Sequence, residues 1–164
     1  NNSYIKNLDI LEQIFKNPKF IFITRDGRDV ACSYLDLAQR EITSIYAPKL
    51  PSNIENIAKE WAINNSLILK KINERSLLIK YEDLVCNTVK TLMRVCEFFD
   101  INYSEYMLMY YKNNDEPKDF LNWKSKTLEK PDCNNVGKYK KILTSEEITI
   151  FESFAGDMLD AFDY

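Results

Sequence analysis

The chain has 164 residues, of which 45% are hydrophobic and 29% charged, with a formal net charge of −3. This composition fits one soluble globular domain, and the acidic balance argues against the broad basic surface of a nucleic-acid-binding protein. No apolar run approaches the ~20 residues that a membrane-spanning helix needs, and no signal segment opens the chain. We therefore expect a single domain over residues 1–164 without a membrane span.

The cysteines are Cys32, Cys86, Cys96 and Cys133, which show no paired spacing, and the chain has no histidine. A zinc site is therefore not expected, and the commonest general base is absent from the sequence. Free and mostly buried thiols are the favoured interpretation. Thiols of this kind are typical of a reducing compartment, so the sequence predicts a cytoplasmic protein.

The N-terminal part of the chain predicts a helix followed by a strand. Apolar residues recur at helical spacing within residues 1–17, and Asn17-Pro18 ends this pattern. The next run, Phe20 to Ile23, is continuous, apolar and too short for a helix. It predicts a strand over residues 20–24 that is buried on both faces of a parallel sheet.

This strand is predicted to run directly into a helix. Asp26 is a good N-cap, and Gly27 stands at the first helical position. Asp29 lies three residues beyond the cap, where its carboxylate can accept hydrogen bonds from the free amides of the first turn. An apolar stripe predicts that the helix continues to Ala38.

The junction between this strand and helix is a candidate anion site, because backbone N–H groups and the positive end of the helix dipole meet there. Arg25 leaves the strand at this edge, Arg28 lies in the first turn, and Ser33 offers a hydroxyl about two turns into the helix. Arginine together with a hydroxyl favours phosphate binding. In the alternative, the arginine pairs with Asp26 or Asp29 and Ser33 only faces solvent.

The middle of the chain predicts a long helix and a second strand. Two prolines interrupt regular structure between residues 44 and 52, and Ser52 or Asn53 then caps an amphipathic helix whose apolar face includes Trp61, a core anchor. A short apolar strand is predicted over residues 77–81. The order of strand, helix, helix and strand predicts an α/β domain with a parallel sheet.

The C-terminal half is predicted to be mostly helical. Helical spacing of apolar residues predicts helices over 86–99 and most of 103–111, and a final helix begins at Thr144 or Ser145. Residues 113–135 are predicted to be irregular, with Trp123 as their one large anchor.

Three stretches, in this order along the chain, resemble the sulfotransferases that use 3'-phosphoadenosine 5'-phosphosulfate (PAPS). The first, RDGRDVACSY at residues 25–34, is similar to the motif that binds the 3'-phosphate, and the resemblance implies that Arg25 and Ser33 hold this phosphate. The second, LIKYEDL at residues 78–84, resembles the segment whose tyrosine, here Tyr81, lies beside the adenine.

The third stretch, VGKYKK at residues 136–141, is similar to the C-terminal glycine, basic residue and tryptophan segment of bacterial and Golgi-type relatives. Tyr139 stands at the position of the usual tryptophan, and Gly27 stands where most relatives carry proline in the first motif. Glycine allows a close backbone approach, and the lysines concentrate positive charge. The resemblance implies that Gly137 and Lys138 cover the 3'-phosphate.

The resemblance also implies an α/β, helix-rich, parallel-sheet fold of the sulfotransferase type, related to nucleotide-binding P-loop folds. Family members bind the 5'-phosphosulfate in a loop with glycine and lysine between the first strand and the first helix, and residues 1–164 contain no such loop. We therefore expect a C-terminal portion, incomplete at the N-terminus. Because open strands invite pairing, a missing N-terminal segment or a second chain is expected to complete the sheet.

The implied activity is transfer of a sulfuryl group from PAPS to a hydroxyl or amine of a small-molecule, carbohydrate or peptide acceptor. No catalytic residue and no metal are assigned, and the fragment alone is expected to be inactive. The alternative is a non-catalytic module that binds 3'-phosphoadenosine 5'-phosphate (PAP) or serves as an interaction domain. In either case, the cofactor-binding residues are predicted to be Arg25, Ser33, Tyr81, Gly137 and Lys138.

Overall fold

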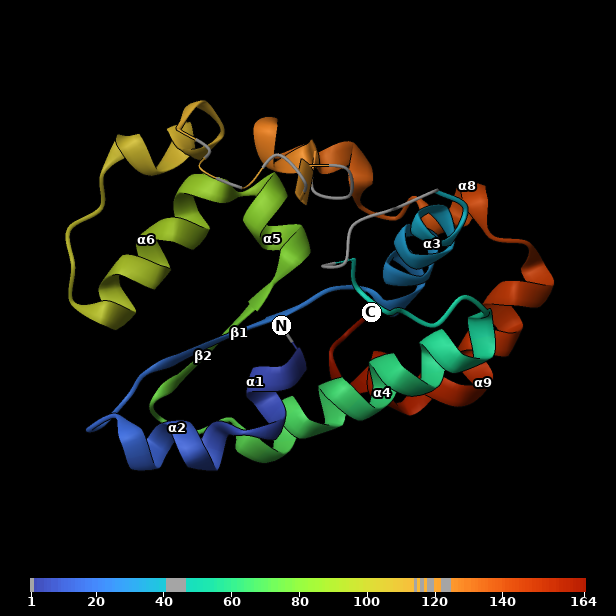
Figure 1. Ribbon diagram of the computed structural model, residues 1–164, viewed down its shortest axis with the longest axis horizontal. Coiled ribbons are helices and arrows are strands. Elements are labelled where there is room, and N and C mark those ends of the chain that lie inside the picture. The colour runs from blue at the N-terminus through green and yellow to red at the C-terminus, as the bar shows by residue number, and fades with distance from the viewer. Residues whose placement is uncertain (1, 41–46, 114, 116, 118–119, 122–124) are drawn as a thin grey trace.

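The computed structural model describes residues 2–40, 47–113, 115, 117, 120–121 and 125–164. Two short strands cross the middle of the molecule, and helices lie on both sides of them (Figure 1). The elements are α1 (Asn2–Lys6), α2 (Leu8–Ile14), β1 (Phe20–Thr24), α3 (Gly27–Ala38), α4 (Ile54–Lys71), β2 (Ser76–Lys80), α5 (Tyr81–Cys86), α6 (Thr88–Phe99), η1 (Glu105–Lys112), η2 (Ser125–Leu128), η3 (Cys133–Asn135), α8 (Tyr139–Ile142) and α9 (Ser145–Ala161).

The sheet in the described part of the chain consists of β1 and β2, which pair in parallel from Phe20 opposite Ser76 to Thr24 opposite Lys80. This arrangement confirms the predicted helix-rich α/β class, and a sheet of two strands agrees with an incomplete fold. The predicted burial of β1 on both faces is wrong. Ile21 and Ile23 are 38% and 54% exposed. The helices α5 and α6 lie beside β2 and contact that strand, so they shield β2 more than β1 (Figure 1).

The main core lies where α3, α4 and α9 meet (Figure 1). Trp61 of α4 packs against Phe151 of α9 with 6.1 Å between ring centroids, and both side chains are buried. This confirms the prediction that Trp61 is a core anchor. A Cβ at Gly27 would lie 2.5 Å from Phe151 Cζ and 2.7 Å from Trp61 Cδ2, so the first turn of α3 approaches these rings closely only because it begins with glycine.

The predicted N-caps are confirmed where the sequence placed them. The side chains of Asp26, Asn53 and Thr144 each accept a hydrogen bond from a backbone N–H of α3, α4 and α9 respectively. The predicted helix over residues 1–17 is instead two short helices, separated at Asn7. Tyr81 does not close the second strand; it begins α5 immediately after β2.

The cysteines depart most clearly from the sequence-based expectation. Cys86, at the end of α5, forms a disulfide with Cys133, at the start of η3, so the predicted free thiols are wrong for this pair. The two are 47 residues apart in sequence, a separation that gives no local signal. Cys32 and Cys96 are free and buried, and burial raises the pKa of Cys32 to about 11.

The connecting segments agree with the sequence in part, because the short 3₁₀ helices η2 and η3 lie within residues 113–135, which were predicted to be irregular. Residues 47–53 have no regular structure, and 103–112 contains a 3₁₀ helix, η1. The predicted irregular segments at 44–52 and 113–135 lie partly outside the described residues, and Trp123 lies wholly outside them. Among the helices that are described, none has the length and apolar character needed to cross a membrane.

Candidate anion-binding site

The turn from β1 into α3 is held from several directions, which fixes where Arg25 lies. The Asp26 carboxylate caps α3 by accepting from Arg28 N at 2.9 Å. The Asp26 backbone N–H donates to Glu82 Oε1 at 3.0 Å, which ties this turn to α5. On the other side, the Trp61 indole N–H donates to the Arg25 carbonyl at 2.9 Å. The Arg25 backbone is therefore positioned by the core as well as by the strand.

The Arg25 guanidinium lies in a partly buried site built from three distant segments. It stacks on the Tyr81 ring, with its central carbon 4.4 Å from the ring centroid. Its Nη2 donates to the Asn135 carbonyl at 2.9 Å, and its Nη1 lies 3.4 Å from Ser33 Oγ. The Asp29 carboxylate is 3.9 Å away. Within the described residues, the buried Arg25 Nε has no hydrogen-bond partner, so the group retains donor capacity.

Ser33 and Lys138 meet beside this guanidinium. Lys138 Nζ donates to Ser33 Oγ at 2.9 Å, while the Ser33 hydroxyl donates to the Asp29 carbonyl at 3.1 Å. The structure thus brings together three residues that the sequence predicted to bind the phosphate, Arg25, Ser33 and Lys138. Lys140 and Lys141 are exposed on α8 and make no described contact with these groups, so only one lysine of the third motif joins the site.

A further cation, Lys126, was not predicted. Lys126 Nζ donates to Asn135 Oδ1 at 2.7 Å, and Asn135 in turn binds Arg25 through its carbonyl. Burial lowers the pKa of Lys138, and the charges of Arg25 and Lys126 lower it further. Three positive charges therefore act on one small region, which is the electrostatic condition for binding an anion.

Asp29 has a role different from the predicted one. Instead of accepting from the first turn of its own helix, its carboxylate accepts from the backbone N–H groups of Gly137 at 2.7 Å and Tyr139 at 2.9 Å. The side chain is fully buried, and its two oxygens are satisfied by a segment more than a hundred residues away. Asp29 therefore joins α3 to the segment that carries Lys138.

Arg28 does not belong to the anion site, although the sequence placed it near the same turn. It binds both oxygens of Asp26, pairs with Glu152 at 2.7 Å, and stacks on the Tyr139 ring at 4.3 Å. These contacts join the first turn of α3 to α8 and α9, so they hold the fold together. The alternative interpretation was an arginine paired with Asp26 or Asp29, and it holds for Arg28, which pairs with Asp26. It holds in part for Arg25, which lies 3.9 Å from Asp29 but also contacts Ser33.

Tyr81 and Gly137 both lie at the site, and each has a structural feature that the sequence did not predict. Arg25 occupies one face of the Tyr81 ring, so this face is not open to a base. Gly137 was expected to permit a close backbone approach, yet a Cβ built there would have no atom within 4 Å. Gly137 instead adopts φ +70°, a left-handed conformation that favours glycine. The turn that it makes directs Lys138 toward Ser33.

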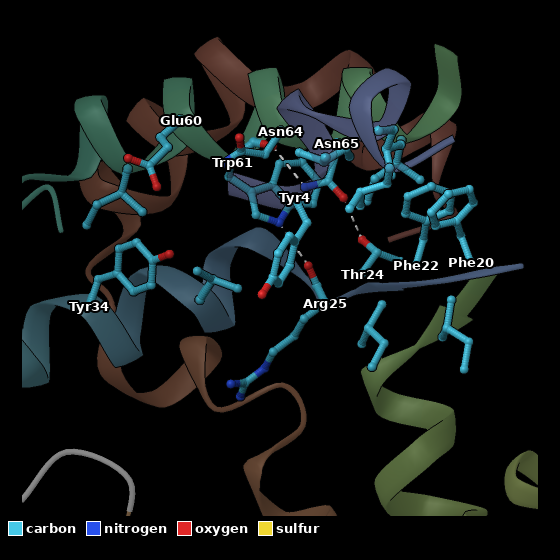
Figure 2. Close-up of a pocket in the computed structure, with 18 residues that line it drawn as sticks. Tyr4, Phe20, Phe22, Thr24, Arg25, Tyr34, Glu60, Trp61, Asn64 and Asn65 are labelled. Atoms are coloured by element: carbon cyan, nitrogen blue, oxygen red, sulfur yellow. Dashed lines mark hydrogen bonds between the residues drawn. The ribbon is translucent and has the colours of Figure 1, made fainter. Parts of the chain in front are cut away.

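A cavity of about 550 Å³ lies along β1, on the side of the Arg25 backbone away from its guanidinium. All six consecutive residues from Phe20 to Arg25 line it. Because neighbouring residues of a strand point to opposite faces, a cavity lined by all of them runs along the edge of the strand. Figure 2 shows Thr24 close to Asn65, with Trp61 nearby and the Arg25 guanidinium pointing away from these three residues.

The signals that identify the missed residues differ in kind. Asp29 was visible in the sequence one helical turn after Arg25, but its partners lie in another segment, so spacing predicted the wrong contact. Asn135 contributes its backbone carbonyl, which any residue type supplies, so no sequence signal marks it. Lys126 lies in a charged segment without periodicity. Whether the five predicted residues bind a cofactor stays a prediction.

The sequence model of the Sulfotransferase family matches residues 1–105. No curated protein matches the chain. Among solved structures, it is similar to a sulfotransferase domain from the curacin biosynthetic pathway, with 22% identity and a TM-score of 0.68.

That match covers 92% of this chain and 59% of the solved structure, so the chain spans about three-fifths of the length of the domain it resembles. At this identity the structural likeness supports the fold, and it agrees with the helix-rich arrangement around a small parallel sheet. The family match covers most of the chain and includes the first two motifs, at residues 25–34 and 78–84. The chain therefore belongs to the sulfotransferase family.

Proposed function

We propose that this chain supplies the 3'-phosphate and adenine side of a PAPS site, in a protein that transfers a sulfuryl group to a hydroxyl or amine. The observation that carries the proposal is the meeting of three predicted residues from distant segments. Arg25 Nη1 and Lys138 Nζ lie 3.4 Å and 2.9 Å from the same oxygen, Ser33 Oγ. A hydroxyl between a guanidinium and an ammonium suits a phosphate ester, because all three groups can donate to its oxygens.

The roles follow from the surroundings of each group. Arg25 is held by the Tyr81 ring and the Asn135 carbonyl, so its guanidinium is positioned before a ligand arrives. Lys138 is partly desolvated, which strengthens its attraction to a dianion. Tyr81, with one face on Arg25, would border the adenine with its ring edge or its other face. PAPS itself would supply the activated sulfuryl group.

The alternative is a non-catalytic module that binds PAP or a partner protein. The same anion site serves both functions, so nucleotide binding alone does not separate them. The reading frame upstream of Asn1 does. A strand followed by a turn with glycine and lysine supports the transferase, because such a turn would hold the 5'-phosphosulfate; a start codon near Asn1 supports the module.

The direct test is titration calorimetry with PAP and with adenosine 5'-monophosphate. Wild type should prefer PAP, and Arg25→Ala should remove the preference, since a charged hydrogen bond is worth about 1.5–3 kcal/mol. Ser33→Ala should weaken PAP binding less, because it removes a neutral donor. Arg40→Ala is the matched control, since Arg40 pairs with Asp36 on the exposed surface. Equal affinities of wild type for the two nucleotides would refute the proposal.

We also propose that a further β-strand pairs with the open edge of β1. The cavity along Phe20–Arg25 and the exposed Ile21 and Ile23 support this, since they give an apolar strand edge that no other strand of the described residues pairs with. A missing segment of the same protein is the proposed occupant, with a second copy as the other outcome. Light scattering and hydrogen exchange test it. A monomer whose β1 amides are as protected as those of β2 contradicts the proposal.

The relation to P-loop folds stays a prediction, tied to the same proposed strand. The cytoplasmic location rested on four free thiols, and the disulfide between Cys86 and Cys133 removes that premise. Disulfides persist mainly in oxidising compartments, so the location is better tested by following the protein in fractionated cells.

A further inference from the structure

Residues 133–139, here named the strap, carry most of the polar groups that reach the anion site from the C-terminal half. We infer that Asp29 and the Cys86–Cys133 disulfide are positioning elements that fasten the two ends of the strap, and that anion affinity falls when either is lost. The inference rests on the proposed function, because it concerns the same site.

The disulfide fastens the first residue of the strap. Cys86 ends α5, and the same short helix begins with Tyr81, on which Arg25 stacks. Cys133 lies two residues before Asn135, whose carbonyl binds Arg25 at 2.9 Å. The disulfide therefore links the short helix that carries the Tyr81 ring to the turn that carries the Asn135 carbonyl, and both groups contact the Arg25 guanidinium. Within a helix of six residues and a turn of three, little chain is left to absorb movement.

Asp29 fastens the other end. Its carboxylate is fully buried and accepts from the amides of Gly137 and Tyr139, the residues on either side of Lys138. A buried carboxylate needs such partners, since leaving it without them is costly. The two hydrogen bonds therefore hold the backbone of Lys138 from both sides. The Lys138 ammonium then needs only its own side chain to reach Ser33.

The contacts between the two fastened ends are those of the ligand site. Asn135 receives Arg25 through its carbonyl and Lys126 through its side chain, and Lys138 reaches Ser33. Each of these three contacts is a hydrogen bond, and the Arg25 guanidinium also lies 3.9 Å from the buried Asp29 carboxylate. If one end of the strap is released, the strap can adopt several positions, and only one of them assembles the anion site. Affinity then falls by the fraction of time that the site is assembled.

Both cysteines of the disulfide are exposed, so a dithiol reductant reaches the bond. In the reduction, the dithiol gives two electrons and two protons to the S–S bond and itself becomes a disulfide, while Cys86 and Cys133 become thiols. The linkage is reciprocal. A nucleotide that binds the fastened strap more tightly also opposes its reduction by the same factor.

The test measures PAP affinity of the full chain by calorimetry in the oxidised and reduced states, with the adenosine 5'-monophosphate affinity beside it. Reduction should weaken PAP binding about tenfold, the scale of one misplaced charged hydrogen bond, and leave binding of the monophosphate nearly unchanged. The double variant Cys86→Ser with Cys133→Ser should bind as reduced wild type does and lose its response to dithiol. Cys96→Ser, which removes a free buried thiol, should retain it.

Asp29→Asn tests the other end. The amide keeps the shape but presents an N–H to one strap amide, so PAP affinity should again fall about tenfold. Asp36→Asn is the matched control, because Asp36 is on the same helix and pairs only with the exposed Arg40 among its described contacts. Near-ultraviolet circular dichroism verifies folding; if Asp29→Asn does not fold, the comparison of oxidised and reduced wild type decides, since both have one sequence.

The outcomes separate this inference from the proposed function. A PAP preference that depends on Arg25 but is unchanged by reduction and in the double serine variant overturns the inference alone. Absence of any PAP preference in oxidised wild type overturns the proposed function. A dithiol–disulfide equilibrium that shifts toward the disulfide in saturating PAP, by the factor seen in affinity, supports the inference independently of calorimetry.

Discussion

The Lys138 ammonium donates to the Ser33 hydroxyl at 2.9 Å, across a sequence separation of 105 residues. This contact joins a helix near the N-terminus to a turn near the C-terminus, beside the Arg25 guanidinium. Neither stretch contains a complete anion site alone. The site exists only when the two are folded together, so its properties are best tested at this contact.

Replacing Lys138 by methionine should weaken PAP binding about tenfold, because it removes one charged donor and keeps a side chain of similar length. The salt dependence of binding should also become shallower. Lys140→Met is the matched control, because Lys140 lies exposed over the Tyr139 ring and not at Ser33. Calorimetry at two salt concentrations measures both effects, and an equal loss in the two variants would assign the effect to net charge alone.

The lowered pKa of Lys138 predicts a pH dependence of binding. Burial, then Arg25 and Lys126, bring this pKa below its ordinary value of 10.5, while a bound anion favours the protonated form. PAP affinity should therefore be constant near neutral pH and fall as the pH rises through the lowered pKa. Lys138→Arg keeps its charge and should give a flat profile. Dissociation constants from about pH 7 to about pH 10 check this.

The same shift has a consequence for folding. Below the folded pKa the lysine is protonated in both states; between the folded pKa and 10.5 the unfolded chain binds more protons than the folded one. Stability relative to Lys138→Met should therefore rise with pH in that window. A difference that instead decreases with pH would show that the folded site favours the charged amine.

Gly137→Ala should destabilise the fold by about 1–2 kcal/mol, the cost of a left-handed conformation for a residue with a Cβ. The added methyl meets no neighbouring atom, so strain at φ +70° is the only source. Gly156→Ala is the contrasting control. Gly156 lies within α9 with open space around it, and alanine there should stabilise by about 0.5–1 kcal/mol. Urea unfolding measures both changes.

Gly27→Ala should destabilise the core by about 1–3 kcal/mol, because its methyl would lie 2.5 Å from Phe151 Cζ. Shortening Phe151 to leucine in the same chain should recover part of that loss, and a double-mutant cycle gives the coupling. If the losses of stability in the two single variants simply add in the double variant, the new methyl is accommodated by movement of groups other than Phe151.

The sequence predicted the elements whose signals are local. The apolar run of β1, the caps of α3, α4 and α9, and the core position of Trp61 each follow from neighbouring residues, and the structure confirms them. The exposure of Ile21 and Ile23 was missed, because an apolar run records what a strand tends to bury and not which neighbours are present.

The parts that failed depend on long-range partners. Asp29 has the same spacing whether it caps its own helix or binds Gly137 and Tyr139, and only the fold decides. Cys86 and Cys133 pair because the end of α5 lies beside the start of η3, which sequence spacing cannot show. Arg25 and Ser33, by contrast, lie on one continuous strand, turn and helix, so the family pattern was enough to place them together.

The disulfide closes a loop between two cysteines that are 47 positions apart in sequence, and this loop contains α6, η1 and η2. The two ends of this loop lie beside the anion site, since one end follows Tyr81 in sequence and the other precedes Asn135. Insertions or deletions between Cys86 and Cys133 therefore leave the distance in space between Tyr81 and Asn135 unchanged, because the disulfide fixes the two ends of the loop. Variation in chain length among homologues should gather inside this loop and be scarce in the few residues on either side of it.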